Sequence, residues 1–433
     1  MANLIQQCKD WLSRQRVFQV LGPGGADSAE PDDSRAESSP EQIELPPKLA
    51  QQLTRLVEQL PIHPDDRATV QSSLESVLAE WQQQPGISSN SLVILSSPVT
   101  AVSRILSEGL AEWAAAQSWS LSHLEWQERP AQPEEIVDKL RLQLGRGTLT
   151  TAVEPEITAI PNLSWCFLRS AEGLDGIDYL RDHLLNDRTR FWVIGSDPVS
   201  WEYLKSVLDL PAYCGQVVSL PELSGEQLAA WIMPVAEALE IHFDSPSIRD
   251  RLQHLNHNHS EQSDSPQRFK DEYFERLADV SEGISTVALQ LFLRSVEAEP
   301  LEAEDAQDAN EDNGNAEASE TTQETQNNPD SEKKETPRSL RLVARSPKLP
   351  SLPQLNQNDH YLLYSLLLHG DLTLTALAES LGDAPQTVNN QVQALRRTGL
   401  LKQQDQVIQV NPIHYPRLQQ ELAANNFLVE RSE

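Results

Sequence analysis

Cysteine is scarce in this sequence, with only Cys8, Cys166 and Cys214 among 433 residues. The three lie far apart and lack the short spacings of metal sites, so we expect neither a disulfide framework nor a bound metal. No uninterrupted apolar run approaches the roughly 18 residues that a membrane-spanning helix needs. The first residues show no apolar core followed by a small-residue cleavage site, so no secretory signal is expected. These absences predict a soluble cytoplasmic protein with reduced thiols.

Positive charge is also in short supply. The chain has 34 Lys and Arg against 65 Asp and Glu, a formal net charge of −31. Such a charge opposes non-specific attraction of the whole molecule to nucleic acid or to anionic membranes, so any binding of that kind requires a local patch. Hydrophobic residues make up only 39% of the chain, which predicts that part of it is unstructured.

The middle of the chain alternates short apolar runs with amphipathic helical patterns. The runs that we interpret as strands lie at 91–95, 119–126, 163–168, 190–195 and 216–220. Regular alternation of strand and helix predicts the α/β class, with a three-layer core built on a parallel sheet. After residue 223 the pattern becomes entirely helical, which predicts a helical lid that follows the core.

Polar, acidic or proline-rich stretches divide the chain into segments. The predicted segments are an amphipathic helix at 1–20, a disordered linker at 21–42, the α/β core at 43–235, the helical lid at 236–296, an acidic disordered linker at 297–350 and a C-terminal domain at 351–433. The first helix carries basic residues and Trp11. We interpret it as a helix that docks on the core, with a membrane-surface or partner anchor as the alternative.

The loop after the first strand has the length of a phosphate-binding P-loop without its residues. When G-x-x-x-x-G-K-[ST] is laid on it, the glycines fall on Ser96 and Ala101, the lysine on Val102 and the hydroxyl on Ser103. Loss of the lysine removes the charge expected on the β- and γ-phosphates, and loss of the glycines crowds the amides that cradle phosphate. Only Ser103 keeps the residue type that holds magnesium. An ordinary strand–helix turn is the alternative interpretation.

By this order of elements, residues 45–296 resemble the AAA+ and related P-loop ATPases. The resemblance implies ATP and magnesium as cofactors, an acidic pair after one core strand and a polar residue after the next. Arg169 and Ser170 stand where the acidic pair is expected after 163–168, whereas Ser196 and Asp197 suit the polar position. The prediction is therefore an inactive, degenerate ATPase-like core without a cofactor. An ATP-dependent switch with a non-consensus loop remains an alternative.

The C-terminal domain shows three helical patterns followed by two short strand patterns around a polar turn. This order predicts a winged helix–turn–helix and resembles the MarR-like DNA-binding modules of bacteria. The side chains that would face DNA are Gln386, Thr387, Asn389, Asn390, Gln393, Arg396, Arg397 and Lys402. The domain has more acidic than basic residues, whereas DNA-binding modules carry a basic surface. Contact with a protein partner is therefore the alternative to DNA binding.

Taken together, these patterns predict a non-catalytic regulatory or scaffolding protein of a bacterial cytoplasm. Its winged helix would contact DNA or a protein partner, and its core would supply protein contacts. A sequence-specific transcriptional regulator is one alternative, and the ATP-dependent switch is the other. Membrane contact through the helix at 1–20 is also left open. No catalytic residue and no metal ligand is predicted.

Overall fold

The computed structural model describes residues 45–84, 87–124, 126, 129–130, 132–145, 156–243, 266–300 and 340–428. The segments predicted at 1–20 and 21–42, and the middle of the one at 297–350, lie outside these residues. The chain divides into two compact units. The sheet unit comprises Leu60–Trp231, Phe274–Phe292 and Pro347–Glu433, and the small unit comprises Met1–Gln59, Ile232–Tyr273 and Leu293–Ser346. We describe each unit by itself.

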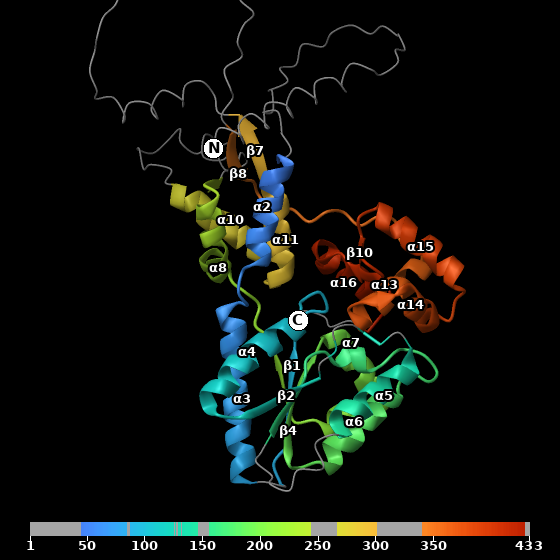
Figure 1. Ribbon diagram of the computed structural model, residues 1–433. Helices are drawn as coiled ribbons and strands as arrows, with labels where there is room; N and C mark the ends of the chain where they lie inside the picture. Colours follow the sequence, from blue (N-terminus) through green and yellow to red (C-terminus); the bar gives the residue numbers. More distant parts are fainter. Residues whose placement is uncertain are drawn as a thin grey trace, which may run out of the picture. The chain divides into compact units, whose positions relative to one another are not determined.

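A five-stranded parallel sheet forms the centre of the sheet unit, in the order β2-β3-β4-β1-β5 (Figure 1). The strands are β1 (Ser91–Leu95), β2 (Ser120–His123), β3 (Glu156–Ile160), β4 (Arg190–Ser196) and β5 (Gln216–Ser219). Every residue of β1 and β4 is buried, as expected for central strands covered on both faces. The predicted α/β class with a parallel sheet is confirmed.

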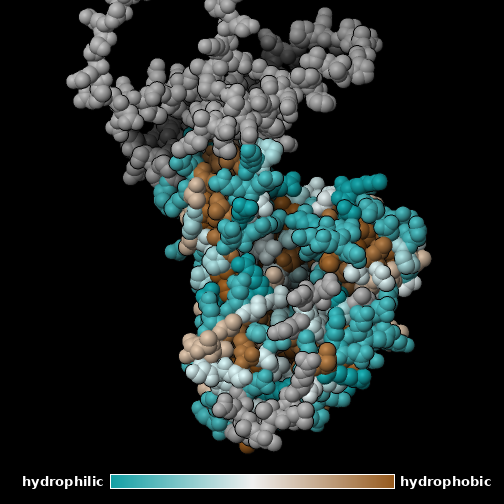
Figure 2. Space-filling view, viewed as in Figure 1, coloured by the Kyte–Doolittle hydropathy of each residue, from teal (hydrophilic) through white to brown (hydrophobic). Residues whose placement is uncertain are grey.

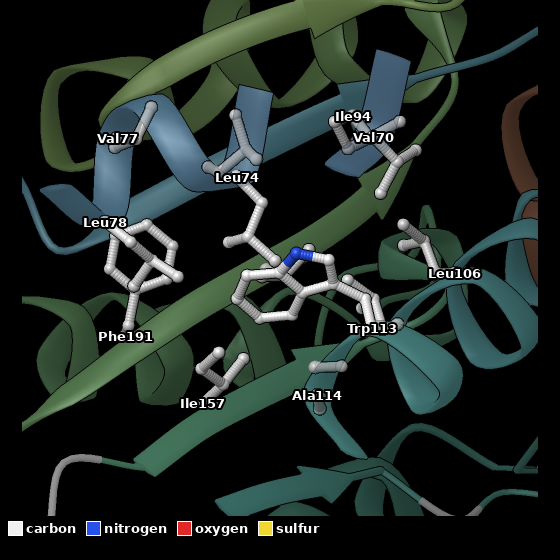
Figure 3. Packing of buried hydrophobic residues seen from close by; sticks show 14 of the residues in the cluster. Val70, Leu74, Val77, Leu78, Ile94, Leu106, Trp113, Ala114, Ile157 and Phe191 are labelled. Atoms are coloured by element: carbon white, nitrogen blue, oxygen red, sulfur yellow. The ribbon is translucent and has the colours of Figure 1, made fainter. Parts of the chain in front are cut away.

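Helices cover this sheet. They are α3 (Pro64–Gln83), α4 (Val102–Gln117), α5 (Pro133–Leu144), α6 (Asp175–Asn186) and α7 (Pro198–Leu208). Leu74 and Trp113, from α3 and α4, pack with Ile157 and Phe191 of the sheet in one buried cluster (Figure 3). The cluster draws alternate residues of each strand, because successive side chains of a strand point to opposite faces. In the view of Figure 1, α5 and α6 lie on the other side of the sheet from α3.

The strand predicted at 163–168 is wrong. The sheet strand lies upstream, at β3, and Leu163–Cys166 form a 3-10 helix, η3. Pro161 and Asn162 end the strand, and Asn162 Oδ1 accepts hydrogen bonds from Ser164 N at 3.1 Å and from Ser164 Oγ at 2.7 Å. The apolar run is buried, but burial alone does not distinguish a strand from another buried segment of the same length.

Residues 357–424 form the C-terminal module of the sheet unit. Its elements are α13 (Gln357–His369), β9 (Leu372–Thr373), α14 (Leu374–Leu381), α15 (Pro385–Arg397), β10 (Leu401–Gln404), β11 (Val407–Val410) and α16 (Tyr415–Ala424). β10 and β11 form an antiparallel hairpin, and β9 pairs with β11. Asn356 and Asp359 form a capping box at the start of α13, and Gly382 and Gly399 adopt positive φ after α14 and α15. The helices and the hairpin expected here from the sequence are present.

The small unit contains α2 (Pro47–Glu58) and a three-stranded sheet in the order β6-β8-β7. The strands are β6 (Ile241–Phe243), β7 (Val296–Pro300) and β8 (Leu340–Ala344). The linker predicted at 297–350 is therefore wrong at both ends, and the lid predicted at 236–296 includes a strand. In β7, Val296 and Ala298 are buried, and the alternating Glu297 and Glu299 pair with Arg345. These acidic residues belong to a paired strand rather than to a solvated tether.

The described chain also contains the helices α8 (Gly225–Ala238), α10 (Pro266–Ser281) and α11 (Ser285–Ser295) and the short 3-10 helices η4 (Leu210–Tyr213) and η6 (Pro412–His414). Hydrophilic side chains dominate the described surface in the view of Figure 2. None of the helices in the described ranges has both the length and the apolar character needed to cross a bilayer.

Candidate functional site

The candidate site lies at the carboxyl ends of β1 and β4. β1 continues through α4 to β2 at one edge of the sheet, whereas β4 continues through α7 to β5 at the other edge. Ligands of open α/β sheets bind where adjacent strands diverge in this way. The structure brings the two predicted groups together here, since Ser96 N donates to Ser196 O at 3.1 Å.

The loop between β1 and α4 uses backbone amides to hold its own shape. Thr100 N donates to Ser97 O at 2.8 Å, and Val102 N donates to Thr100 O at 2.8 Å. A P-loop instead directs its amides outward to the phosphates. Ala101 precedes α4 without a capping side chain and is exposed, and Ser103 is half-buried in the first turn.

Val102 occupies the position of the P-loop lysine and points elsewhere. Its side chain is 6% exposed and belongs to the apolar cluster of α3, α4 and the sheet. A side chain at position 102 that contacted a phosphate could not pack in this cluster at the same time. The position therefore serves packing of α4 on the sheet.

Asp197 caps α7. Its Oδ1 accepts Ser200 N at 2.8 Å, and Ser200 Oγ lies 2.6 Å from its Oδ2. Burial raises the pKa of Asp197 from 3.8 to about 7, and the hydrogen bonds from Ser200 oppose that rise. Both oxygens of the carboxyl group are occupied, so Asp197 acts as a helix cap here.

The hydroxyl group of Ser200 has two close oxygen neighbours, and these contacts bear on the protonation of Asp197. Ser200 Oγ lies 2.6 Å from Asp197 Oδ2 and 2.5 Å from the backbone oxygen of Leu368 in α13. A hydroxyl has a single proton to donate. Both contacts become hydrogen bonds when protonated Asp197 donates to Ser200 and Ser200 donates to Leu368. The raised pKa of Asp197 agrees with that arrangement.

A cavity of about 580 Å³ opens at this edge of the sheet. The loop residues Ser96, Ser97 and Thr100 line it, together with segments around 219–223 and 282–285 and with Tyr415 and Gln419 of α16. The hydroxyl oxygens of Ser96 and Ser97 are buried, and neither has a hydrogen-bond partner in the described part of the chain. Of the residues predicted to contact a nucleotide, only Ser96 belongs to the described lining of this cavity. Ala101, Val102, Ser103, Ser196 and Asp197 are not part of that lining.

Carboxylates supply the charge of this cavity. Asp66, Glu222 and Glu282 line it, and its described lining includes no Lys or Arg. Burial and the neighbouring Asp65 raise the pKa of Asp66 to about 6. Burial, with a smaller contribution from Glu222, raises the pKa of Glu282, while a hydrogen bond from Gln420 opposes it. These residues come from α3 and from two turns, and the sequence analysis did not single them out.

The three carboxylates of the cavity come from separate parts of the chain. Within the described ranges, no group of three or more His, Cys, Asp or Glu side chains is arranged to hold a metal ion. The three carboxylates of the cavity are therefore not gathered as a metal centre. Hydroxyl and carboxylate groups of this kind suit a cationic or hydrogen-bonding ligand rather than a phosphate.

The second set of predicted residues lies on α15 and on the hairpin. Gln386, Thr387, Asn390, Arg396 and Arg397 are exposed, whereas Asn389 and Gln393 are half-buried. Arg396 Nη1 donates to Gln403 Oε1 at 2.6 Å, which joins α15 to the hairpin. α15 contains no acidic residue. Its exposed face is accordingly a small positive surface on an acidic chain.

Lys402 differs from the other residues of this set. Its Nζ donates to Gln290 Oε1 of α11 at 3.0 Å, and burial lowers its pKa. In this arrangement Lys402 holds the hairpin to α11. It does not extend the exposed face of α15.

A polar contact joins the C-terminal module to the core, and the sequence analysis missed it. Arg129 is 8% exposed and donates to the backbone oxygens of Ser164 and Phe167. Its Nε lies 3.8 Å from Asp371 Oδ1, and Trp165 Nε1 donates to the same oxygen at 3.0 Å. The module is thus held through charge pairing as well as through packing.

His369, the last residue of α13, is the centre of this contact. Its Nε2 accepts the backbone N–H of Arg169 at 3.2 Å, and its backbone oxygen lies 2.9 Å from Ser164 Oγ. Burial, reinforced by Arg129, holds the pKa of His369 well below its ordinary value, so the ring stays neutral. The only sequence signal near this contact is Arg169, which stands where an acidic pair was expected.

No family model matches the chain, and no curated protein matches its sequence. Among solved structures, the RuvB Holliday junction branch migration motor of Thermotoga maritima is 13% identical, with a TM-score of 0.30 over 81% of this chain and 93% of that chain. The ADP form of the Aeropyrum pernix ORC2 protein is 12% identical, with a TM-score of 0.37 over 87% and 98%. The ORC1 protein of the same organism, in complex with DNA, is 12% identical, with a TM-score of 0.33 over 86% and 97%. At this level of similarity none of them assigns an activity to this chain.

Proposed function

We propose that this chain is a non-catalytic scaffolding or regulatory protein of a bacterial cytoplasm. In this proposal residues 43–235 form an ATPase-like scaffold that takes no nucleotide, and residues 351–433 form a winged helix that contacts a partner. One observation carries the proposal: the cavity beside the loop after β1, which Ser96, Ser97 and Thr100 line, is also lined by three carboxylates and, in its described lining, by no Lys or Arg.

The charge of the cavity opposes phosphate directly. A nucleotide triphosphate would bring several negative charges against Asp66, Glu222 and Glu282. Like charges about 4 Å apart repel by about 4 kcal/mol at an effective dielectric constant of 20. A P-loop offsets phosphate charge with a lysine, with free amides and with magnesium. Here Val102 replaces the lysine, and the amides of Thr100 and Val102 are already bonded within the loop.

The test is a calorimetric titration of the full chain with ATP and ADP, with and without magnesium. We expect no heat of binding at nucleotide concentrations up to about 1 mM, the range in which nucleotide-dependent enzymes usually work. Magnesium-dependent binding that Ser103→Ala abolishes would contradict the proposal, because Ser103 is the one residue that keeps its P-loop type.

A charge-neutral variant serves as the control for the electrostatic reason. The triple substitution Asp66→Asn, Glu222→Gln and Glu282→Gln keeps the size of the side chains and removes the negative charge. Nucleotide binding that appears only in this variant would show that charge excludes phosphate from the wild-type cavity. If neither wild type nor this variant binds nucleotide, the exclusion of nucleotide is due to Val102 and to the loop whose amides are hydrogen-bonded internally.

The partner surface in this proposal is the exposed face of α15. The contact of the module with the core is made by other residues, His369 of α13 and Ser380 of α14, which bind Arg129, Ser164 and Arg169. α15 presents mainly amide side chains with two arginines at its end. A protein partner with a polar, weakly acidic surface suits this face.

DNA is the second candidate, and Arg396 and Arg397 favour it. The amide side chains of Gln386 and Asn390 are of the type that reads adenine in the major groove, and the two arginines can contact phosphate. Because Lys402 is hydrogen-bonded to Gln290, the cationic side chains of this face are Arg396 and Arg397. A binding site with so few phosphate contacts depends only weakly on salt.

For DNA binding, the double substitution Arg396→Ala and Arg397→Ala is decisive. If DNA is the partner, we expect affinity for bound genomic fragments to fall at least tenfold, and the slope of log K against log salt to be about −2. Gel-shift titration at several salt concentrations measures both quantities. Arg417→Ala, an exposed arginine on α16, is the matched control and should leave binding unchanged. A fragment bound equally by wild type and the double variant would exclude α15 as the DNA-reading helix.

A further inference from the structure

A second cavity, of about 590 Å³, lies between α7, the segment that follows η3, and the C-terminal module of the sheet unit. Five rings and one guanidinium account for most of its chemistry: Tyr203, His360, Tyr361, Tyr364, Phe427 and Arg169. This volume lies in the range of small-molecule sites, about 300–1,000 Å³. Neither the proposed scaffold role nor the surface of α15 makes use of it.

The aromatic walls are held in place by one another. The ring of Phe427 lies 5.2 Å from Tyr361 and 5.1 Å from Tyr364, between ring centroids. On the core side, Tyr203 stacks on the buried Phe167 at 5.8 Å. Rings at these separations pack favourably, and together they form a wall against which a flat ligand ring can lie.

Hydrogen-bond donors converge between these walls. The side chain of Arg169 is fixed by a hydrogen bond from Nη2 to Ser380 O at 2.9 Å, and its Nε is buried without a hydrogen-bond partner in the described residues. The positive charge of Arg169 acts on both Tyr203 and Tyr364. Neither tyrosine hydroxyl has a hydrogen-bond partner within the described ranges. Three side chains with donor groups therefore line the same cavity.

Both tyrosines remain donors at neutral pH. Burial raises the pKa of Tyr364 to about 12, and the charge of Arg169 opposes that rise. Burial likewise raises the pKa of Tyr203, and Arg169 again opposes it. A protonated hydroxyl and a guanidinium both donate to an oxyanion.

The charge of the cavity favours one negative charge. Arg169 is the only Lys or Arg in its described lining, and no Asp or Glu lines it. The acidic neighbours Glu421, which pairs with His360 at 3.1 Å, and Asp197 lie outside the lining. A single guanidinium matches a carboxylate, whereas a phosphate ester with about two charges would remain partly uncompensated in an acidic chain.

We propose that this cavity binds a small aromatic monocarboxylate, with its ring against Phe427 and Tyr361 and its carboxylate on Arg169, Tyr203 and Tyr364. The ligand would touch α7 of the core and α13 of the module at once. Binding would therefore strengthen the contact between the two. This role goes beyond the proposed scaffold function and does not depend on the identity of its partner.

Calorimetric titration of the full chain with 4-hydroxybenzoate and with indole-3-acetate tests the proposal. The two probes share the carboxylate and differ in ring size. We expect at least one to bind with a dissociation constant below about 1 mM, which corresponds to a modest small-ligand affinity. Three control compounds each lack one feature: 4-hydroxybenzamide lacks the carboxylate, phenyl phosphate carries more than a single charge, and acetate lacks the ring. Each should bind at least tenfold more weakly than the probe that binds.

Variants place the binding at this cavity. Tyr203→Phe and Tyr364→Phe keep the rings and remove one donor each, so each should weaken the bound probe about tenfold, as expected for a hydrogen bond to a charged group. Arg169→Gln should abolish binding. Tyr213→Phe, a tyrosine outside the cavity, is the matched control and should bind as wild type does. The proposal would be overturned if neither 4-hydroxybenzoate nor indole-3-acetate gave a heat of binding, or if 4-hydroxybenzamide bound as tightly as 4-hydroxybenzoate. It would also be overturned if the cavity variants bound the probe as wild type does.

Discussion

Replacing Arg129 with methionine is expected to lower the free energy of unfolding by about 2–4 kcal/mol, because it leaves buried polar partners without their donor. The backbone oxygens of Ser164 and Phe167 would lose a charged donor, and Asp371 would lose its counter-ion. Burial lowers the pKa of Arg129 to about 10, with Asp371 opposing the shift, so the side chain is charged at neutral pH. Urea unfolding at pH 7 measures the loss.

A double-mutant cycle separates the ion pair from the rest of the contact. Asp371→Asn alone should cost about 1 kcal/mol, the typical net contribution of a hydrogen-bonded group. The double variant should cost less than the sum of the two single variants, because removing both charges leaves no unpaired charge behind. Additive losses would show that Arg129 and Asp371 do not interact in the folded protein.

Arg141→Met is the matched control for this cycle. Arg141 is 64% exposed and lies 3.7 Å from Asp138 on the same helix. An exposed pair of this kind contributes about 0–1 kcal/mol, so the free energy of unfolding should change little. A loss in Arg129→Met no larger than that of the control would contradict the role assigned to the buried arginine.

The parts of the fold that the sequence predicted are those with strong local patterns. The run from Leu92 to Leu95 and the run from Phe191 to Ile194 are long enough and apolar enough to identify two central strands. Pro385 and Gly399 mark the start and the end of α15. Such signals act within a few residues of each other, so one sequence is sufficient to find them.

The parts that the sequence analysis missed depend on pairing over long distances. β3 contains Glu156 and Thr158 among its apolar residues, so it is less apolar than the run at 163–168 that follows it in the sequence. β7 and β8 are short and partly charged, and they become strands because they pair with each other. These strands are buried only once the unit has assembled, so a short stretch of sequence does not reveal them.

The same distinction applies to the candidate site. The loop at Ser96–Ser103 and the end of β4 were assigned to one site by the resemblance to P-loop ATPases, and in the structure Ser96 N donates to Ser196 O. The predicted role of these residues toward a nucleotide stays a prediction. The carboxylates of the cavity could not be found this way, because Asp66, Glu222 and Glu282 come from three separate elements. Arg129 and His369 are 240 residues apart in the chain.

Replacing Asp197 with asparagine is expected to make stability less dependent on pH. In the unfolded chain this carboxyl group has a pKa near the model-peptide value of about 3.9. In the folded chain burial raises it to about 7. Between these values the folded state holds a proton that the unfolded state has released, so this contribution to stability is complete below the unfolded pKa and is lost as pH rises through about 7.

The size of the effect follows from the same shift. From pH 5 to pH 8, the free energy of unfolding of wild type should fall by about 2–3 kcal/mol relative to Asp197→Asn, since one pKa unit corresponds to 1.36 kcal/mol. Asparagine keeps an acceptor for Ser200 N and offers a donor to Ser200 Oγ, as protonated Asp197 does. Urea unfolding at pH 5, 6, 7 and 8 measures the divergence of the two curves.

Other titrating groups do not account for such a divergence. Tyr364, which interacts with Asp197, has its pKa raised to about 12 by burial and stays protonated throughout. Asp66, with its pKa raised to about 6 by burial, is present in both proteins and cancels in the comparison. Asp138→Asn, at a side chain that is 79% exposed, is the matched control and should give a constant difference across this range.

The result also tests the proton assigned to Ser200. If Asp197 ionises above pH 7, it takes the hydrogen bond of Ser200 Oγ, and the backbone oxygen of Leu368 loses its donor. The contact between α7 and α13 should then weaken in wild type and persist in Asp197→Asn. Hydrogen exchange of the α13 amides at pH 6 and pH 8 measures this directly. Parallel stability curves with unchanged exchange would mean that Asp197 is already ionised at pH 5 and that Leu368 O is held by another donor.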